Sequence, residues 1–321
     1  MLNKLKLSDT VIRKKCLFFG IAIFFFSLFL SSFYVGGDQI GYSSAYLAMK
    51  GMNFIDAWDQ YHKYLTNQEP IHFFISFSGG MIDANKNLLF SLLNGVLAFC
   101  TAKIYLNWGV SFWYLLVILL TNFYFLGLYF SAERLKLSVL FFELSYLSSA
   151  KPLKRILFAI LSLGAHFSII FPIVSGCSLL IKRYRLAFTF RNVFFGLLLI
   201  VIFLCLLYFY WDTGYLDSKI DAYATNDINV ITIFPTLLLF SYCIYKRKDF
   251  LIPCIFFIPL LVAIFFLGGS RLNFFSFFSA IFLLKNHQAF KDPLIFLLFT
   301  YLSIKGVKFI YDVITFGHAI F

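Results

Sequence analysis

Long apolar stretches, separated by short polar segments, follow one another along most of the chain. A helix needs about 20 predominantly apolar residues to cross the hydrocarbon core of a membrane, and fewer when it is buried among other helices. The alternation therefore predicts a polytopic helical membrane protein. The stretches that we interpret as membrane crossings are Leu17–Tyr34, Leu88–Leu106, Val110–Phe130, Leu135–Ser149, Leu153–Ala165, Phe167–Ile181, Asn192–Trp211, Val230–Tyr245, Phe250–Leu267, Leu272–Leu284 and Leu294–Tyr311.

One further apolar stretch, Ile71–Ile82, is short and interrupted by Gly79 and Gly80. It follows Gly36–Pro70, a polar segment rich in aromatic residues, which we interpret as an outer loop. A short stretch with a glycine break is typical of a re-entrant or interfacial helix rather than a spanning one. The predicted fold is an all-α polytopic membrane protein, a single integral domain over residues 1–321, with about eleven transmembrane helices.

The basic residues test this topology, because Lys and Arg in short loops stay on the cytoplasmic side. With Lys4–Lys15 inside and Ile71–Ile82 not crossing, the clusters Lys151–Arg155, Lys182–Arg191 and Lys246–Lys248 all fall inside. If Ile71–Ile82 crosses, the first two of these clusters move to the outer face. We therefore expect the N-terminus inside and the C-terminus outside.

Composition agrees with a membrane protein, since 61% of the 321 residues are apolar and 13% are charged. Soluble domains have roughly 45–50% apolar and about 25% charged residues. The net charge of +12 does not indicate a nucleic-acid partner, because the basic residues lie in short clusters between apolar stretches. The sequence has no GxGxxG, P-loop, HExxH or GxSxG motif, and we expect no metal or other cofactor.

Five polar residues that helix packing does not require fall on or near the outer face in this topology. An ionisable group close to the hydrocarbon is costly, so each is a functional candidate. Carboxylates and imidazole are candidates for a general base toward a hydroxyl, and guanidinium groups for bidentate contacts with phosphate oxygens. The candidates are Asp38, Glu69 and His166 for catalysis, and Arg134 and Arg271 for binding a diphosphate.

The two arginines also have a structural interpretation. A lone Arg at a helix end is usually an interface anchor. Arg134 lies beside Glu133 and Lys136, which together fit an ordinary solvated helix end. Arg271 fits this interpretation less well, because no other charge occurs between Leu251 and Leu284.

The acidic residues and His166 have structural interpretations as well. Asp38 beside two glycines can form an Asx turn, and Glu69 before Pro70 can begin a helix. A lone His in an apolar helix pair is often a hydrogen-bonded packing residue. Glu143, in the middle of an apolar stretch, is as well explained by pairing with a neighbouring helix as by chemistry.

These elements, taken in order, resemble the EpsG-like family of bacterial membrane proteins, which includes Wzy-type polymerases of O-antigen and capsular polysaccharide. The chain departs from the family pattern at Gln39, where Tyr is common, at Ile71, where Gly is usual, and at Leu135, where Gln is usual. The matching elements are Gly36-Gly37-Asp38 with Tyr42 and Tyr46, Glu69-Pro70-Ile71-His72-Phe73, Arg134 before a helix, Ala165-His166-Phe167-Ser168, and Ser270-Arg271 before an aromatic-rich helix.

The resemblance implies a glycosyltransferase that polymerises polyprenyl-diphosphate-linked oligosaccharides at the outer face of the bacterial plasma membrane. Its implied partners are this lipid-linked substrate, membrane lipids and a chain-length regulator protein. The alternatives are another membrane enzyme of the same pathway, such as a lipid-dependent glycosyl- or acyltransferase, or a transporter or flippase of lipid-linked sugars. We expect most outer-loop aromatic residues, Tyr42 and Tyr61 among them, to form an interfacial belt rather than to stack on sugars.

Overall fold

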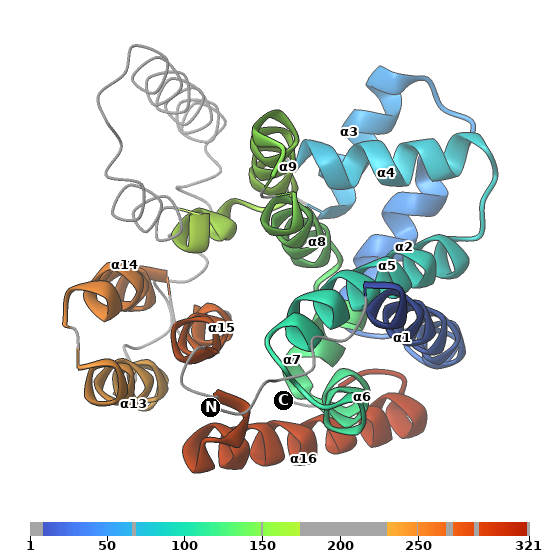
Figure 1. The fold of residues 1–321 in the computed structure, drawn as a ribbon. Helices are drawn as coiled ribbons and strands as arrows, with labels where there is room; N and C mark the ends of the chain where they lie inside the picture. The colour runs from blue at the N-terminus through green and yellow to red at the C-terminus, as the bar shows by residue number, and fades with distance from the viewer. Residues whose placement is uncertain are drawn as a thin grey trace. The chain divides into compact units, whose positions relative to one another are not determined.

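Every regular element that the structure, a computed structural model, describes is helical (Figure 1). The prediction of an all-α fold is therefore confirmed for this part of the chain. Two compact units are present, residues 1–169 with 290–321, and residues 170–289; a single domain over residues 1–321 stays a prediction. The described residues are 9–65, 69–148, 150–173, 230–248, 250–267, 272–285 and 289–319.

The first unit begins with a long helix and ends with the last helix that the structure describes. A short 3₁₀ turn, η4 (Ala289–Lys291), leads into that last helix. The helices of this unit are α1 (Asp9–Ser31), α2 (Asp38–Ala48), α3 (Phe54–Leu65), α4 (Pro70–Met81), α5 (Lys86–Asn107), α6 (Phe112–Thr121), α7 (Phe123–Leu126), the π-helix η1 (Gly127–Ser131), α8 (Glu133–Leu147), α9 (Pro152–Ala165), the 3₁₀ turn η2 (Phe167–Ile169) and α16 (Pro293–Phe316).

Helices α1 and α5 pack against each other at a pair of glycines. A Cβ atom at Gly95 would lie 2.8 Å from the carbonyl oxygen of Gly20, so the missing side chains let the two backbones approach closely. The buried positions of α1 recur every three or four residues, which places them on one face of the helix. They are Cys16, Phe19, Ile23, Ser27 and Leu30.

The segment predicted as an outer loop is largely helical, and its place at the outer face stays a prediction. It forms α2 and α3, and α3 packs on both α2 and α4. Tyr42 and Tyr61 are 5% and 0% exposed, so these two residues do not form part of an interfacial belt. Their hydroxyl groups bond to an arginine and a histidine, described below, and these polar partners keep the rings inside the protein.

Helix α4 continues through Gly79 and Gly80 instead of breaking there. A Cβ atom at Gly79 would lie 2.6 Å from both the Tyr46 hydroxyl and Leu89 Cδ2, so this glycine permits close packing. With 12 residues, α4 is about 18 Å long, against a hydrocarbon core of about 30 Å. This length agrees with the prediction that Ile71–Ile82 does not span a membrane.

The stretch predicted as one crossing over Val110–Phe130 is bent by 54° between α6 and α7. Asn122 lies at the bend and its side chain accepts a hydrogen bond from the Tyr124 amide at 3.0 Å, which caps the start of α7. Helix α16 packs against both halves of the bend. Gly306 is required there, because a Cβ atom would lie 1.6 Å from the Thr121 carbonyl oxygen.

Helices α8 and α9 form an antiparallel hairpin that is joined by small polar residues (Figure 1). The Ser138 hydroxyl donates to the Ser162 carbonyl at 2.8 Å, and the Ser162 hydroxyl donates to the Ser138 carbonyl at 2.6 Å. Because the hairpin returns on itself, the start of α8 and the end of α9 lie at the same end.

Fewer helices meet the length for crossing a membrane than the eleven predicted. In the described ranges α1, α5 and α16 are long and apolar enough, and the bent pair of α6 with α7 and η1 makes a fourth. Most of the other predicted crossings form helices of 13 to 17 residues, about 20–26 Å long, which is shorter than the hydrocarbon core. Most of Phe167–Ile181 and all of Asn192–Trp211 lie outside the described residues.

The second unit contains three described helices that pack on one another. Polar groups join two of them, because the Thr236 hydroxyl lies 2.8 Å from Asn273 Oδ1 and 2.7 Å from Ser276 Oγ. The helices are α13 (Val230–Arg247), α14 (Leu251–Leu267) and α15 (Leu272–Leu284).

The end of α16 closes the first unit against the start of α2. Gly317 caps α16 in the left-handed conformation, with φ 75°, where a residue without a Cβ atom is favoured. Its carbonyl oxygen accepts hydrogen bonds from the Val35 amide at 3.0 Å and the Gly36 amide at 2.8 Å. The chain between α1 and α2 is therefore held by the C-terminal helix.

Candidate functional site

A cluster of buried ionisable residues lies where α2, α4, α5, α8 and α9 meet. The chain at or near one end of α4, α5, α8 and α9 contributes these residues, since a helix end is where a chain can place a charge beside an apolar interior, and α2 supplies Gln39 and Tyr42 as hydrogen-bond partners. Glu69 caps α4 ahead of Pro70, and His166 caps the C-terminal end of α9. The cluster consists of Glu69, His72, Lys86, Glu133, Arg134, Lys136 and His166.

Glu69 is the centre of the first half of the cluster. Its carboxylate has no exposed surface and binds Arg134 through Oε2 at 2.5 Å and His166 Nδ1 through Oε1 at 2.7 Å. The side chains of Arg134 and His166 keep 12% and 14% of their surface exposed, so a ligand can reach them although it cannot reach Glu69. The geometry is that of a carboxylate that orients an imidazole beside a guanidinium group.

The charges around Glu69 keep it ionised. Burial alone would raise the pKa of the Glu69 carboxyl, but the Arg134 charge and the His166 hydrogen bond outweigh burial and hold that pKa well below its usual range. Such a carboxylate is a weak base. It is better suited to holding His166 in one tautomer than to accepting a proton from substrate.

Glu133 is the centre of the second half and is also fully enclosed. Its Oε1 lies 3.1 Å from Lys86 Nζ and accepts a hydrogen bond from Gln39 Nε2 at 3.0 Å, while Oε2 lies 3.4 Å from His72 Nε2. Burial opposes its charge, but the neighbouring cations, led by Lys86, lower the pKa of Glu133 to about 2. The other ring nitrogen of His72 lies 3.0 Å from the Tyr61 hydroxyl.

Tyr42 connects the two halves. Its hydroxyl accepts a hydrogen bond from Arg134 Nε at 3.2 Å. Its ring centroid lies 5.8 Å from Lys86 Nζ and 5.4 Å from the His72 ring. The cationic groups are therefore held against an aromatic face as well as against the carboxylates.

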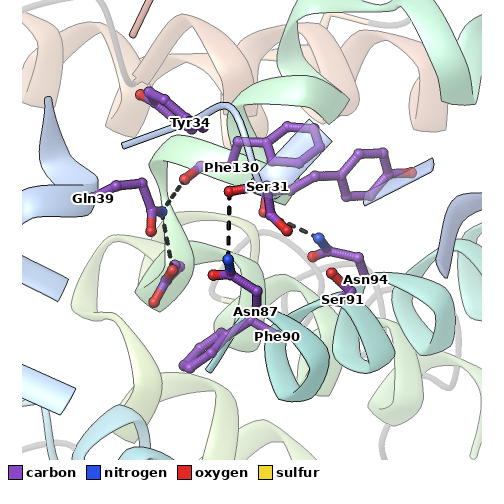
Figure 2. Close-up of a pocket in the computed structure, with 10 residues that line it drawn as sticks. Ser31, Tyr34, Gln39, Asn87, Phe90, Ser91, Asn94 and Phe130 are labelled. Atoms are coloured by element: carbon purple, nitrogen blue, oxygen red, sulfur yellow. Dashed lines mark hydrogen bonds between the residues drawn. The ribbon is translucent and has the colours of Figure 1, made fainter. Parts of the chain in front are cut away.

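A small polar cavity lies beside the Glu133 half of the cluster (Figure 2). The cavity has a volume of about 20 Å³, which is room for a single water. Figure 2 shows Gln39 reaching toward Phe130 and Asn94 reaching toward a backbone carbonyl, that of Tyr129 at 3.1 Å. The Asn94 side-chain oxygen is buried without a protein partner among the described residues, so a water is the natural ligand there.

The charges of the cluster do not balance. Lys86, Arg134 and Lys136 supply three positive charges, and Glu69 and Glu133 supply two negative ones. With both histidines neutral, the cluster keeps one excess positive charge in a region with little water. That excess favours an anionic ligand.

The structure brings three of the five predicted site residues together: Glu69, Arg134 and His166. Asp38 begins α2 with an exposed side chain, outside the cluster. Arg271 lies outside the described residues. In the described ranges, no group of three or more His, Cys, Asp and Glu side chains is arranged to hold a metal ion.

The interpretation of Glu133 and Lys136 as part of a solvated helix end is wrong. They are 3% and 0% exposed, because α8 begins inside the bundle, packed on α4 and α5 and hydrogen-bonded to Gln39 of α2, rather than at its surface. The signal in the sequence was three ionisable residues within four positions between two apolar stretches. Glu143 does pair with a neighbouring helix, accepting a hydrogen bond from the Thr101 hydroxyl at 2.8 Å.

Comparisons with known proteins add no relative to this picture. No family model matches the chain, and no curated protein and no solved structure matches it.

Proposed function

We propose that this protein is a membrane glycosyltransferase that joins polyprenyl-diphosphate-linked oligosaccharide units into a polysaccharide at the outer face of the bacterial plasma membrane. The observation that carries the proposal is the buried Glu69 carboxylate between His166 and Arg134. The resemblance of these sequence elements to the EpsG-like family supports it. So does the excess positive charge, because the leaving group of such a reaction is a diphosphate.

In the proposed reaction, an acceptor hydroxyl attacks the anomeric carbon of the lipid-linked donor. The new glycosidic bond forms as the carbon–oxygen bond to the diphosphate breaks, and the diphosphate leaves with the bonding electrons. With Nδ1–H donated to Glu69, the Nε2 atom of His166 carries the lone pair that takes the hydroxyl proton. Glu69 acts as a positioning residue, and it stabilises the imidazolium that forms.

Arg134 is the proposed contact for the diphosphate. Nη1 binds Glu69 and Nε binds Tyr42, while Nη2 has no acceptor among the described residues. A guanidinium group that is held at Nε and Nη1 and is partly exposed suits a developing phosphate charge.

The test is complementation of a strain in which the gene has been deleted, with polymer length read on gels at matched protein level in the membrane. His166→Gln should lower the rate of polymer formation by about 10²–10⁴, the usual contribution of a general base. His318→Gln is the matched control, because His318 is exposed and lies outside the cluster. Polymer of normal length with His166→Gln contradicts the proposed role. Long chains that lack only a substituent in the deletion strain contradict the polymerase itself.

A further inference from the structure

An apolar groove between α3 and α4 takes no part in the charge cluster. Its open volume is about 220 Å³, and it is lined by Phe54, Ile55, Trp58, Pro70 and Phe74. Ile55 is 71% exposed and Phe74 is 48% exposed. Trp58, one of the lining residues, packs its ring edge-on against the Phe73 ring, with centroids 4.7 Å apart.

Helix α3 indicates the depth at which this groove lies. Ile55 and Trp58 face the groove, while Asp56, Asp59 and Lys63 are exposed. A 12-residue helix with one apolar and one charged side is typical of a helix lying in the plane of the membrane interface. At that depth the head group of a lipid meets its hydrocarbon chain.

One lining residue of the groove lies next to the charge cluster. Pro70, which lines the groove, directly follows Glu69 in the chain. The start of α4 also touches the end of α9, because a Cβ atom at Gly164, two residues before His166, would lie 3.1 Å from Ile71 Cγ1. The same hypothetical Cβ atom would lie 3.9 Å from Pro70 Cγ, so the Pro70 side of the groove packs next to the helix end that carries His166.

We propose that this groove binds the isoprenoid chain of the donor, in the part nearest its diphosphate. The inference rests on the proposed function and adds the location of the carrier lipid. An amphiphile with its diphosphate at the partly exposed Arg134 side chain would place its first isoprene units along Pro70 and Phe74. The groove then binds this lipid in preference to ordinary membrane lipids, because its apolar wall lies beside a cluster with an excess positive charge.

The proposal is tested by photo-crosslinking the full-length protein in nanodiscs with farnesyl diphosphate that carries a diazirine on its isoprenoid chain. Labelled peptides should come from α3 and α4, and unlabelled farnesyl diphosphate should displace the probe. Excess phosphatidylglycerol should leave the labelling unchanged. Equal displacement by phosphatidylglycerol would show a surface for general lipid and overturn the proposal, as would labelling mainly outside α3 and α4.

Ile55→Glu should reduce the labelling about tenfold, equivalent to about 1.4 kcal/mol, because it places a charge in the apolar groove. Ile82→Glu is the matched control, since Ile82 is 77% exposed and does not line the groove. Equal labelling of the two variants overturns the groove. Normal polymer from Ile55→Glu at limiting donor also contradicts isoprenoid binding in the groove, and it does not contradict the proposed polymerase function. Specific labelling of a protein that makes no polymer contradicts the proposed polymerase function, and it does not contradict isoprenoid binding in the groove.

Discussion

Glu69 makes the folded state sensitive to acid. The pKa of its carboxyl lies below the unfolded value of 4.5, so its stabilising effect is complete above that pH and is lost as the pH falls through the folded pKa. Glu69→Gln should cost on the order of 3 kcal/mol near neutral pH, because Arg134 then lacks its buried counter-charge.

The measurement is the midpoint of thermal unfolding of the purified protein between about pH 7 and about pH 3. The wild-type midpoint should fall more steeply below pH 5 than that of Glu69→Gln, with Glu133 supplying the slope that remains. Parallel curves for the two proteins would show that folding does not lower the pKa of Glu69, contrary to this prediction.

Lys136 is a buried cation with little compensation. Its Nζ lies 3.3 Å from the Tyr129 carbonyl oxygen and 5.0 Å from the Phe90 ring centroid, and its side chain has no exposed surface. A buried charge without a carboxylate in contact costs free energy, because it has lost its hydration, and an apolar group of similar volume avoids that cost. Lys136→Met should therefore keep or raise the midpoint of thermal unfolding.

Lys136→Ala is the comparison, because it also removes the packing of the side chain and leaves a cavity. Large-to-small changes of this kind cost about 2–5 kcal/mol. If Met is as destabilising as Ala, the charge of Lys136 itself stabilises the fold, contrary to this prediction.

The sequence predicted three members of the site but not their partners. Counting the membrane crossings predicts Glu69, Arg134 and His166, because each lies at an end of an apolar stretch that the topology places at the outer face. Lys86, His72 and Gln39 gave no such signal, since their burial depends on how α2 and α4 fold over α5. No periodicity within either helix encodes that contact.

The two adjacent glycines of α4 offer a direct test of helix packing. Gly79→Ala should destabilise the protein, because its Cβ atom would lie 2.6 Å from the Tyr46 hydroxyl and from Leu89 Cδ2. Gly80→Ala should be neutral or stabilising by up to about 1 kcal/mol, because the nearest atom is 3.8 Å away and Ala favours a helix over Gly. Thermal unfolding of both variants checks the pair, and equal effects would contradict the packing described for α4.

Helix existence was easier to predict than helix role. The apolar stretches of α1, α5 and α16 form helices long and apolar enough to cross a membrane, whereas the stretches of α8 and α9 form helices of only 15 and 14 residues. The sequence of Gly36–Pro70 does not predict α2 and α3, because aromatic and polar residues alternate there without a long apolar stretch. Their helices are held by contacts with α4 rather than by their own composition.

The topology of the first unit can be tested with single cysteines. If α1, α5 and the bent pair of α6 with α7 and η1 cross, α2 to α4 do not, and the 15-residue α8 also crosses, then Lys50 lies outside and the Lys151 end of the α8–α9 hairpin lies inside. In a background that lacks the six native cysteines, a membrane-impermeant maleimide should label Lys50→Cys in intact cells. It should label Lys151→Cys only after permeabilisation. Labelling of Lys151→Cys in intact cells would place Arg134 and His166 away from the outer face.

The contact between Gly317 and the start of α2 sets an order of events during synthesis. Two backbone amides, at Val35 and Gly36, have their acceptor more than 280 positions later in the chain. Helix α2 follows them directly and carries Gln39 and Tyr42 into the charge cluster. A nascent chain that stops short of Gly317 has made every charge of the cluster but lacks the acceptor that holds the segment leading into α2. The site is therefore a late product of translation, although most of its residues are made early.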